Sequence, residues 1–165
     1  MKLEELVESS KQVHIFVDLD GTLCDFDKKV KELTGKLPSE LPKKELWKAV
    51  YSIPDFFESL EWLPDGKQLW NAVKQYHPTI LTGLPSSKNG KAQKEKWCAQ
   101  HLGPNVPVIV CPSRDKHMYA KPGYIIIDDR NDIIQSWNSA GGKGILRRDT
   151  TSVIIQLHKI IDGAA

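Results

Sequence analysis

An apolar run near the start of the chain ends abruptly in two acids, and this stretch most constrains the fold. Residues 12–17, QVHIFV, have the composition of a buried strand. Asp18 and Asp20 follow one residue apart, and Gly21-Thr22 predicts that the chain turns at once. Both carboxylates then lie at the carboxyl edge of the strand, where they repel each other unless a cation or a shared proton joins them. An ordinary solvated Asp-Gly turn is the alternative interpretation.

Apolar segments alternate with helical patterns along most of the chain. The patterns predict strands at residues 12–17, 79–81, 106–110, 123–127 and 143–146, and helices at residues 3–8, 64–76, 88–101, 131–139 and 150–161. This alternation predicts an α/β, Rossmann-like three-layer fold around a mostly parallel sheet of about five strands. With 165 residues, the chain is long enough for one such domain, spanning residues 1–165.

The segment from about residue 25 to residue 62 departs from the alternation. It contains several lysines, three prolines and short helical stretches such as residues 43–51. A simple strand-to-helix connection needs only a few residues, so the segment is expected to be a small helical cap inserted after the first strand. Its aromatic residues are expected to form mostly its own core, with one or two available to face a ligand: Phe26, Trp47, Tyr51, Phe56, Phe57 and Trp62.

Composition excludes several function classes. The net charge of +2 provides no broad electrostatic footprint for a stable nucleic-acid partner. No run of about 18 apolar residues occurs, so no membrane span is expected. The three cysteines are widely spaced and form no CxxC pair, which favours a reducing, cytoplasmic location over a disulfide framework or zinc site. Composition leaves the oligomeric state open.

The polar clusters all follow predicted strands. Because ligands bind beyond the carboxyl ends of parallel strands, these side chains are expected to meet at one edge of the sheet. The clusters are Asp18 with Asp20, Thr82 with Gly83, Arg114 with Lys116, and Asp128 with Asp129. Four carboxylates without a neighbouring histidine or cysteine favour Mg²⁺, while a hydroxyl, glycine-turn amides and lysines suit a phosphate. The chemistry indicated is phosphoryl transfer, with one aspartate free to attack phosphorus.

These residues resemble the motifs of the haloacid-dehalogenase-like phosphatases. Asp18-Leu19-Asp20-Gly21-Thr22-Leu23 is similar to their first motif, Thr82 after an apolar strand to their second, and residues 126–129 to their fourth. The resemblance implies that Asp18 is the nucleophile and that Asp20 is general acid and then general base. It also implies that Thr82 holds a phosphoryl oxygen. The implied magnesium ligands are Asp18, the backbone carbonyl of Asp20, Asp128 and Asp129, with Asp129 favoured over Asp128 as the direct one.

A closer resemblance is to the 5'(3')-deoxyribonucleotidases of this superfamily. It is carried by the segments 25–26, 56–60, 94–104, 114–116 and 127–130. It implies that Lys94 is the charge-neutralising lysine, with Lys121 as the rival candidate, and that Phe26 stacks near the base. Gly83, Arg114 and Lys116 are implied around the substrate. The chain departs from the family in having Gly83 where serine is usual, and in a shorter insertion without the Phe-Trp segment that lines the base pocket.

The function predicted is therefore a magnesium-dependent phosphomonoester hydrolase acting through an aspartyl-phosphate. (Deoxy)nucleoside monophosphates are the leading substrates, and another small phosphate ester or a nucleic-acid end is the alternative. A phosphorylatable receiver-like domain or a catalytically inactive binding domain represents a different class. Cys24 lies close to the acids but has no partner histidine in the pattern, so it is expected to be a small buried filler rather than a nucleophile.

Overall fold

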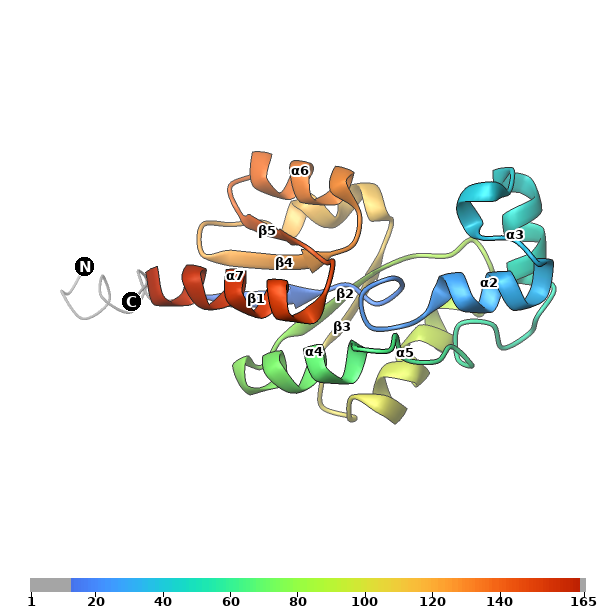
Figure 1. Ribbon diagram of the computed structural model, residues 1–165, viewed down its shortest axis with the longest axis horizontal. Helices are drawn as coiled ribbons and strands as arrows, with labels where there is room; N and C mark the ends of the chain where they lie inside the picture. The colour runs from blue at the N-terminus through green and yellow to red at the C-terminus, as the bar shows by residue number, and fades with distance from the viewer. Residues whose placement is uncertain (1–12, 164–165) are drawn as a thin grey trace.

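The computed structural model describes residues 13–163, which form a five-stranded sheet between helices (Figure 1). All neighbouring strands are parallel, in the order β3-β2-β1-β4-β5. The strands are β1 (His14–Val17), β2 (Thr79–Gly83), β3 (Val108–Cys111), β4 (Tyr124–Asp128) and β5 (Lys143–Leu146). The strand order reverses at β1, so the carboxyl ends of β1 and β4 flank the crevice where such sheets bind ligands.

Helices cover both faces of the sheet. Those that follow β1 are α2 (Phe26–Thr34), η1 (Pro38–Glu40), α3 (Lys43–Tyr51), α4 (Gly66–Val73), η2 (Lys74–Tyr76), α5 (Gly90–His101), η3 (Ser113–Tyr119), α6 (Asn131–Ser139) and α7 (Thr150–Gly163). Apolar residues of α4, α5 and α7 share one core with the sheet, whereas α6 and η3 contribute to a second. The arrangement confirms the predicted three-layer α/β fold.

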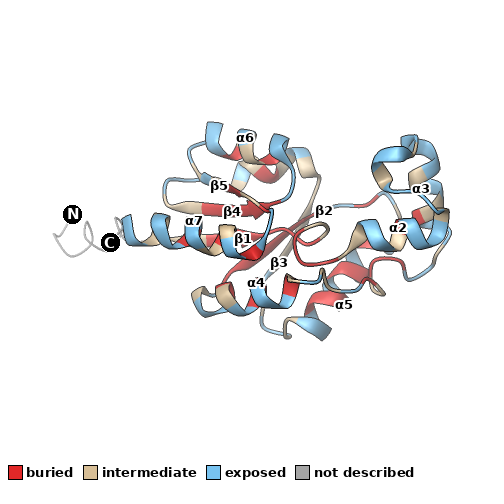
Figure 2. Cartoon of the chain, in the orientation of Figure 1, coloured by how far each residue is buried: buried red, intermediate tan, exposed pale blue. Residues whose placement is uncertain are grey.

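Strand alternation produces the two cores. Along β1, Ile15 and Val17 belong to the core beneath α4, α5 and α7, and Phe16 belongs to the core beneath α6. In β4, Ile125 and Ile127 face the first core and Ile126 the second. Figure 2 shows this buried interior concentrated in the strands and the inner faces of the helices. Because the three central strands, β1, β2 and β4, are buried on both faces, their ends are held rigidly, which suits them to position a site.

Residues 25–62 contain α2, η1 and α3, which project beyond one end of the sheet, opposite the end where α7 finishes (Figure 1). The Asp25 side chain accepts from the Lys28 backbone N–H at 3.1 Å and so caps α2. Gly35, with φ of 76°, ends this helix in a left-handed conformation. This segment therefore lies over the carboxyl side of the sheet, near the acids that follow β1.

Several element boundaries differ from those expected. The helix expected over 64–76 divides into α4 and η2, and the strand expected at 106–110 covers Val108–Cys111. Residues 113–119, for which no helix is predicted, form η3. The lead-in helix expected at 3–8 falls outside the described residues. Over residues 13–163, none of the helices has the length and apolar character needed to cross a bilayer.

Candidate active site

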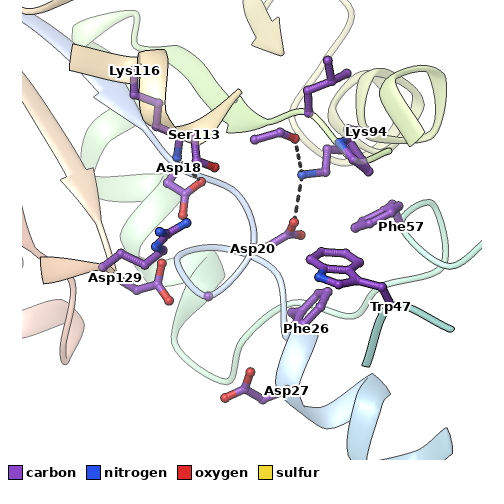
Figure 3. Close-up of a pocket in the computed structure, with 15 residues that line it drawn as sticks. Asp18, Asp20, Phe26, Asp27, Trp47, Phe57, Lys94, Ser113, Lys116 and Asp129 are labelled. Carbon is purple, nitrogen blue, oxygen red and sulfur yellow. Dashed lines mark hydrogen bonds and ion pairs between the residues drawn. The ribbon is translucent and has the colours of Figure 1, made fainter. Parts of the chain in front are cut away.

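A pocket of about 280 Å³ opens at the carboxyl edge of the sheet, beneath α2 and α3 (Figure 3). Its lining combines acids and lysines on the sheet side with aromatic and apolar residues from the helical segment and the loop after β2. The lining residues are Asp18, Asp20, Gly21, Phe26, Asp27, Trp47, Phe57, Gly83, Leu84, Pro85, Lys94, Ser113, Lys116, Asp129 and Arg130. The pocket therefore has a charged floor and an apolar wall.

The loop after β1 is a single tight turn. The Leu19 carbonyl accepts from the backbone N–H groups of Leu23 and Cys24, at 2.8 Å and 2.9 Å. Gly21 has φ of 81°, and a Cβ at this position would overlap the Asp129 carboxylate. Glycine is thus required here both for its conformation and for the close approach of the loop after β4. The turn brings the two loops that carry the acids into contact.

Lys116 lies between two of the acids. Its Nζ donates to Asp18 Oδ1 at 2.9 Å and to Asp128 Oδ2 at 2.8 Å, and only 3% of the residue is exposed. Burial alone would lower the pKa of this lysine, but the carboxylates of Asp18 and Asp128 outweigh burial and hold the pKa above its usual value. Lys116 therefore stays charged and neutralises part of the acid cluster.

Asp18, Asp128 and Asp129 fit a hard divalent cation. Each offers one carboxylate oxygen, and the three oxygens lie within 4.8 Å of one another. Burial raises the pKa of the Asp128 and Asp129 carboxyl groups, and repulsion from the neighbouring carboxylates raises it further. The Asp129 residue is exposed at the pocket mouth, but its carboxyl group is enclosed by these neighbours. An all-oxygen donor set under mutual repulsion suits Mg²⁺.

Asp20 and Lys94 form a second, separate ion pair. Lys94 Nζ lies 2.9 Å from Asp20 Oδ2 (Figure 3). It also donates to Thr82 Oγ1 and the Gly83 carbonyl, at 2.9 Å and 2.8 Å. Asp20 Oδ1 is buried but has no hydrogen-bond partner among the described residues. A buried carboxylate oxygen without a partner is costly, and it is the kind of group that a substrate satisfies.

Three aromatic side chains form the apolar wall. Phe26 and Trp47 have ring centroids 6.2 Å apart, and the Phe57 ring lies 5.0 Å from Lys94 Nζ. Figure 3 shows the three rings gathered beside Asp20, on the side away from Asp129. Leu84 and Pro85 complete this side of the pocket. A planar, partly apolar group attached to a phosphate could occupy it while the phosphate lies on the charged floor.

No family model matches the chain. The mitochondrial 5'(3')-deoxyribonucleotidase of Mus musculus is 26% identical over 161 residues, covering 81% of this chain and 71% of its own length. The cytosolic-type 5'(3')-deoxyribonucleotidase of Homo sapiens is 27% identical over 150 residues, covering 75% of this chain and 74% of its own length. Among solved structures, the L-2-haloacid dehalogenase from Xanthobacter autotrophicus has a TM-score of 0.53 at 11% identity, covering 90% of this chain and 83% of that one.

The chain shares the fold of the L-2-haloacid dehalogenase, and at 11% identity this likeness concerns the fold alone. The two deoxyribonucleotidases are in line with the family resemblance that the motifs after β1, β2 and β4 predict. Together the comparisons support a haloacid-dehalogenase-like phosphatase near the deoxyribonucleotidases.

The structure brings together most of the residues predicted for the site, but it separates two of them. Lys121 lies before β4, exposed, with its Nζ 5.7 Å from the Tyr124 ring centroid, so it cannot serve as the charge-neutralising lysine at the other end of the strand. Arg114 lines a different cavity, with His117 and residues of α6. Both placements correct the sequence-based expectation.

The lysine nearest the nucleophile candidate is also not the one expected. Lys116, predicted only to approach the substrate, contacts Asp18, whereas Lys94 contacts Asp20 and Thr82. The only sequence signal for this contact is that Lys116 lies between the end of one predicted strand and the start of the next. Trp47 and Arg130 also line the pocket. Arg130 directly follows the Asp128-Asp129 pair, and that adjacency was the available signal.

Cys24 is fully buried, and this burial raises the pKa of its thiol well above the ordinary value. The negative charge of Asp20 raises the pKa further, by a smaller amount. A thiol that stays protonated is a poor nucleophile. The expectation that Cys24 packs as a small buried side chain is therefore confirmed by its burial.

Proposed function

We propose that the protein hydrolyses phosphate monoesters through an aspartyl-phosphate on Asp18. The single observation that carries this is a second carboxyl group, Asp20, which lines the same pocket as Asp18 and whose Oδ1 is buried without a partner among the described residues. A nucleophilic carboxylate needs a nearby acid to protonate the leaving oxygen, and that free oxygen supplies it. A receiver-like domain, which holds its phosphoryl group rather than releasing it, would have no use for such a group.

In the first step an Asp18 carboxylate oxygen attacks phosphorus, and the bond from phosphorus to the ester oxygen breaks. Asp20, protonated at this stage, gives its proton to the departing oxygen. In the second step Asp20 removes a proton from water, whose oxygen attacks phosphorus and releases inorganic phosphate, restoring the Asp18 carboxylate. Lys116 and Lys94 hold the two acids in place, and the role given to Thr82, donating to a phosphoryl oxygen, is supported by its contact with Lys94.

Asp18, Asp128 and Asp129, with the backbone carbonyl of Asp20, would hold Mg²⁺. The bound ion supplies positive charge that stabilises the phosphoryl oxygens as charge develops on them. The three carboxylates are supported in this role by their mutual spacing and by the raised pKa of Asp128 and Asp129.

We further propose that residues 25–62 act as a small cap and that the substrate is a (deoxy)nucleoside monophosphate. The aromatic wall supports a planar leaving group, and the two named relatives are deoxyribonucleotidases. Another small phosphate ester or a phosphorylated nucleic-acid end is the alternative that a substrate screen would reveal.

A reducing, cytoplasmic location belongs to this proposal and is supported by three free cysteines, two of them buried.

Two measurements test the mechanism. Phosphate release should be measured across nucleoside monophosphates, sugar phosphates and phosphorylated oligonucleotides, with and without Mg²⁺, for the wild type and for Asp18→Asn. The Asp18→Asn variant should lose all turnover but keep its fold. Full activity in this variant would overturn the proposal.

Asp20→Asn separates the acid from the base role. With p-nitrophenyl phosphate, whose leaving group needs no proton, this variant should release a burst of about one equivalent of nitrophenol and then slow, because dephosphorylation lacks its base. With a nucleoside monophosphate it should show no burst. Equal losses on both substrates without a burst would contradict the role given to Asp20.

A further inference from the structure

Gln93, the residue before Lys94 on α5, has no place in the chemistry but is almost fully buried, at 8% exposure. Its side-chain amide binds the backbone that carries the aromatic wall. Nε2 donates to the Pro54 carbonyl at 2.9 Å, and Oε1 accepts from the Phe57 N–H at 2.9 Å. The Glu58 N–H lies at 3.4 Å from the same oxygen. One buried side chain thus supplies hydrogen-bond partners to backbone groups of residues 54–58.

The residue fixed most directly by these bonds is Phe57. Its own side chain lines the pocket, with the ring 5.0 Å from Lys94 Nζ. The ring also packs edge-on against Phe56, at 5.1 Å between centroids, and Phe56 packs against Phe26 at 5.4 Å. The aromatic wall therefore includes Phe57, a residue whose backbone N–H is hydrogen-bonded to Gln93 of α5.

The attachment continues one helical turn later. Trp97, four residues after Gln93 and on the same face of α5, donates from Nε1 to the Leu60 carbonyl at 2.9 Å. Both bonds are buried and reach the segment that leads back to α4. By contrast, the Tyr51 hydroxyl of α3 meets Ser86 Oγ at 2.6 Å in an exposed contact. Residues 54–60 are therefore anchored through buried bonds to the helix that also carries Lys94.

We propose that Gln93 is a positioning residue that sets selectivity for the leaving group by fixing Phe57 relative to Lys94. Lys94 contacts Asp20 and Thr82, so it lies at the end of the site where the phosphate would bind. The position of Phe57 relative to Lys94 then determines the distance between the phosphate and a planar ring of the leaving group. Esters whose leaving group carries such a ring gain from this spacing, whereas small alcohol esters do not. The inference rests on the proposed phosphatase activity and concerns only which esters it prefers.

The test compares thymidine 5'-monophosphate with glycerol 3-phosphate in wild type and Gln93→Leu, which keeps the side-chain size but loses the hydrogen bonds. We expect KM for the nucleotide to rise about tenfold, with kcat/KM for glycerol phosphate changing by less than about twofold. Gln100→Leu, an exposed position on the same helix, is the matched control and should change neither. Equal losses on both substrates would overturn the proposal.

A double-mutant cycle with Phe57→Ala tests the route of the effect. If Gln93 acts through Phe57, adding Gln93→Leu to Phe57→Ala should raise KM by less than about twofold. Fully additive effects would overturn the proposal. Amide hydrogen exchange at Phe57 should also become faster in Gln93→Leu, whatever substrate is used, and unchanged exchange would count against the anchoring role.

Two further results separate this proposal from the function on which it rests. If Gln93→Leu fails to fold, Gln93→Met takes its place, because it keeps the length of the side chain while losing both amide hydrogen bonds, and it should raise KM for the nucleotide in the same way. A Gln93→Met variant with unchanged KM would overturn the proposal. A wild type that hydrolyses both esters with equal kcat/KM would overturn the selectivity proposal and leave the phosphatase intact. A wild type active on no phosphate ester would overturn both.

Discussion

Asp65 should give the protein a pH-dependent part of its stability. Its carboxylate accepts from Arg147 Nη2 at 2.6 Å, and from the Thr150 backbone N–H and hydroxyl at 3.0 Å and 2.9 Å. These bonds, that to Arg147 first, lower the pKa of Asp65 from 3.8 to about 2. Arg147 also donates to the Thr22 carbonyl at 3.0 Å, so the same network holds the loop of Asp18 and Asp20.

The magnitude follows from the pKa. A tenfold change in an acid dissociation constant corresponds to about 1.4 kcal/mol, so a fall from 3.8 to about 2 corresponds to about 2 kcal/mol. With 34% of the Asp65 side chain exposed, screening by solvent reduces the expected value to about 1 kcal/mol. Because the folded pKa is lowered, this stabilisation is complete above about pH 4 and is lost as the pH falls toward 2, with about half remaining at pH 3.

The assay is urea unfolding of wild type and Asp65→Asn at steps from pH 7 to pH 3. The variant should be less stable by about 1 kcal/mol at pH 7, and the difference should shrink to about half at pH 3. Glu61→Gln, which removes the exposed ion pair with Lys28, is the control and should leave the urea midpoint near that of the wild type at pH 7. A difference between wild type and Asp65→Asn that stays constant from pH 7 to pH 3 would refute the reasoning.

Four other outcomes are expected. Removal of Mg²⁺ with a chelator should abolish phosphate release, and adding it back should raise the melting temperature of the wild type, because a cation relieves repulsion among the acids. Gly21→Ala should lower turnover by about 100-fold or more and weaken the Mg²⁺-dependent rise in melting temperature, since a Cβ there overlaps the Asp129 carboxylate. Gly35→Ala, which has the same left-handed backbone but nothing within 4 Å, should cost about 1 kcal/mol of stability without loss of activity. In native protein Cys111 should be alkylated by iodoacetamide before the two buried cysteines, as followed by mass spectrometry.

The parts of the site that the sequence predicted are those fixed by short-range rules. A buried apolar run followed by acids and a glycine locates the carboxyl end of a strand, and parallel strands bring such ends to one edge. Asp18, Thr82 and Asp128 come together for this reason. The strand boundaries were predicted to within about two residues because the apolar runs are short and both faces are buried.

The parts that were not predicted depend on rotation within η3 and on contacts between distant elements. Arg114 and Lys116 are two residues apart on a 3₁₀ helix, which turns about 120° per residue, so they point to different sides. The sequence pattern predicts no helix over these residues, so it could not distinguish the directions of the two side chains. Trp47 reaches the pocket through the packing of α3 against α2, where its ring lies 6.2 Å from that of Phe26, and nothing in its neighbouring residues indicates that direction.

The two lysines explain how four acids can occupy one small site. Each lysine serves a different part of the site: Lys116 forms ion pairs with Asp18 and Asp128, while Lys94 forms one with Asp20. The groups concerned are Asp18, Asp20, Asp128 and Asp129, against Lys94 and Lys116. Four negative charges less two positive ones leave two negative charges when all are ionised, which one divalent cation cancels. Without a cation, a phosphate dianion would meet a negatively charged floor, and this repulsion is the electrostatic reason for proposing that the site binds Mg²⁺ together with its substrate.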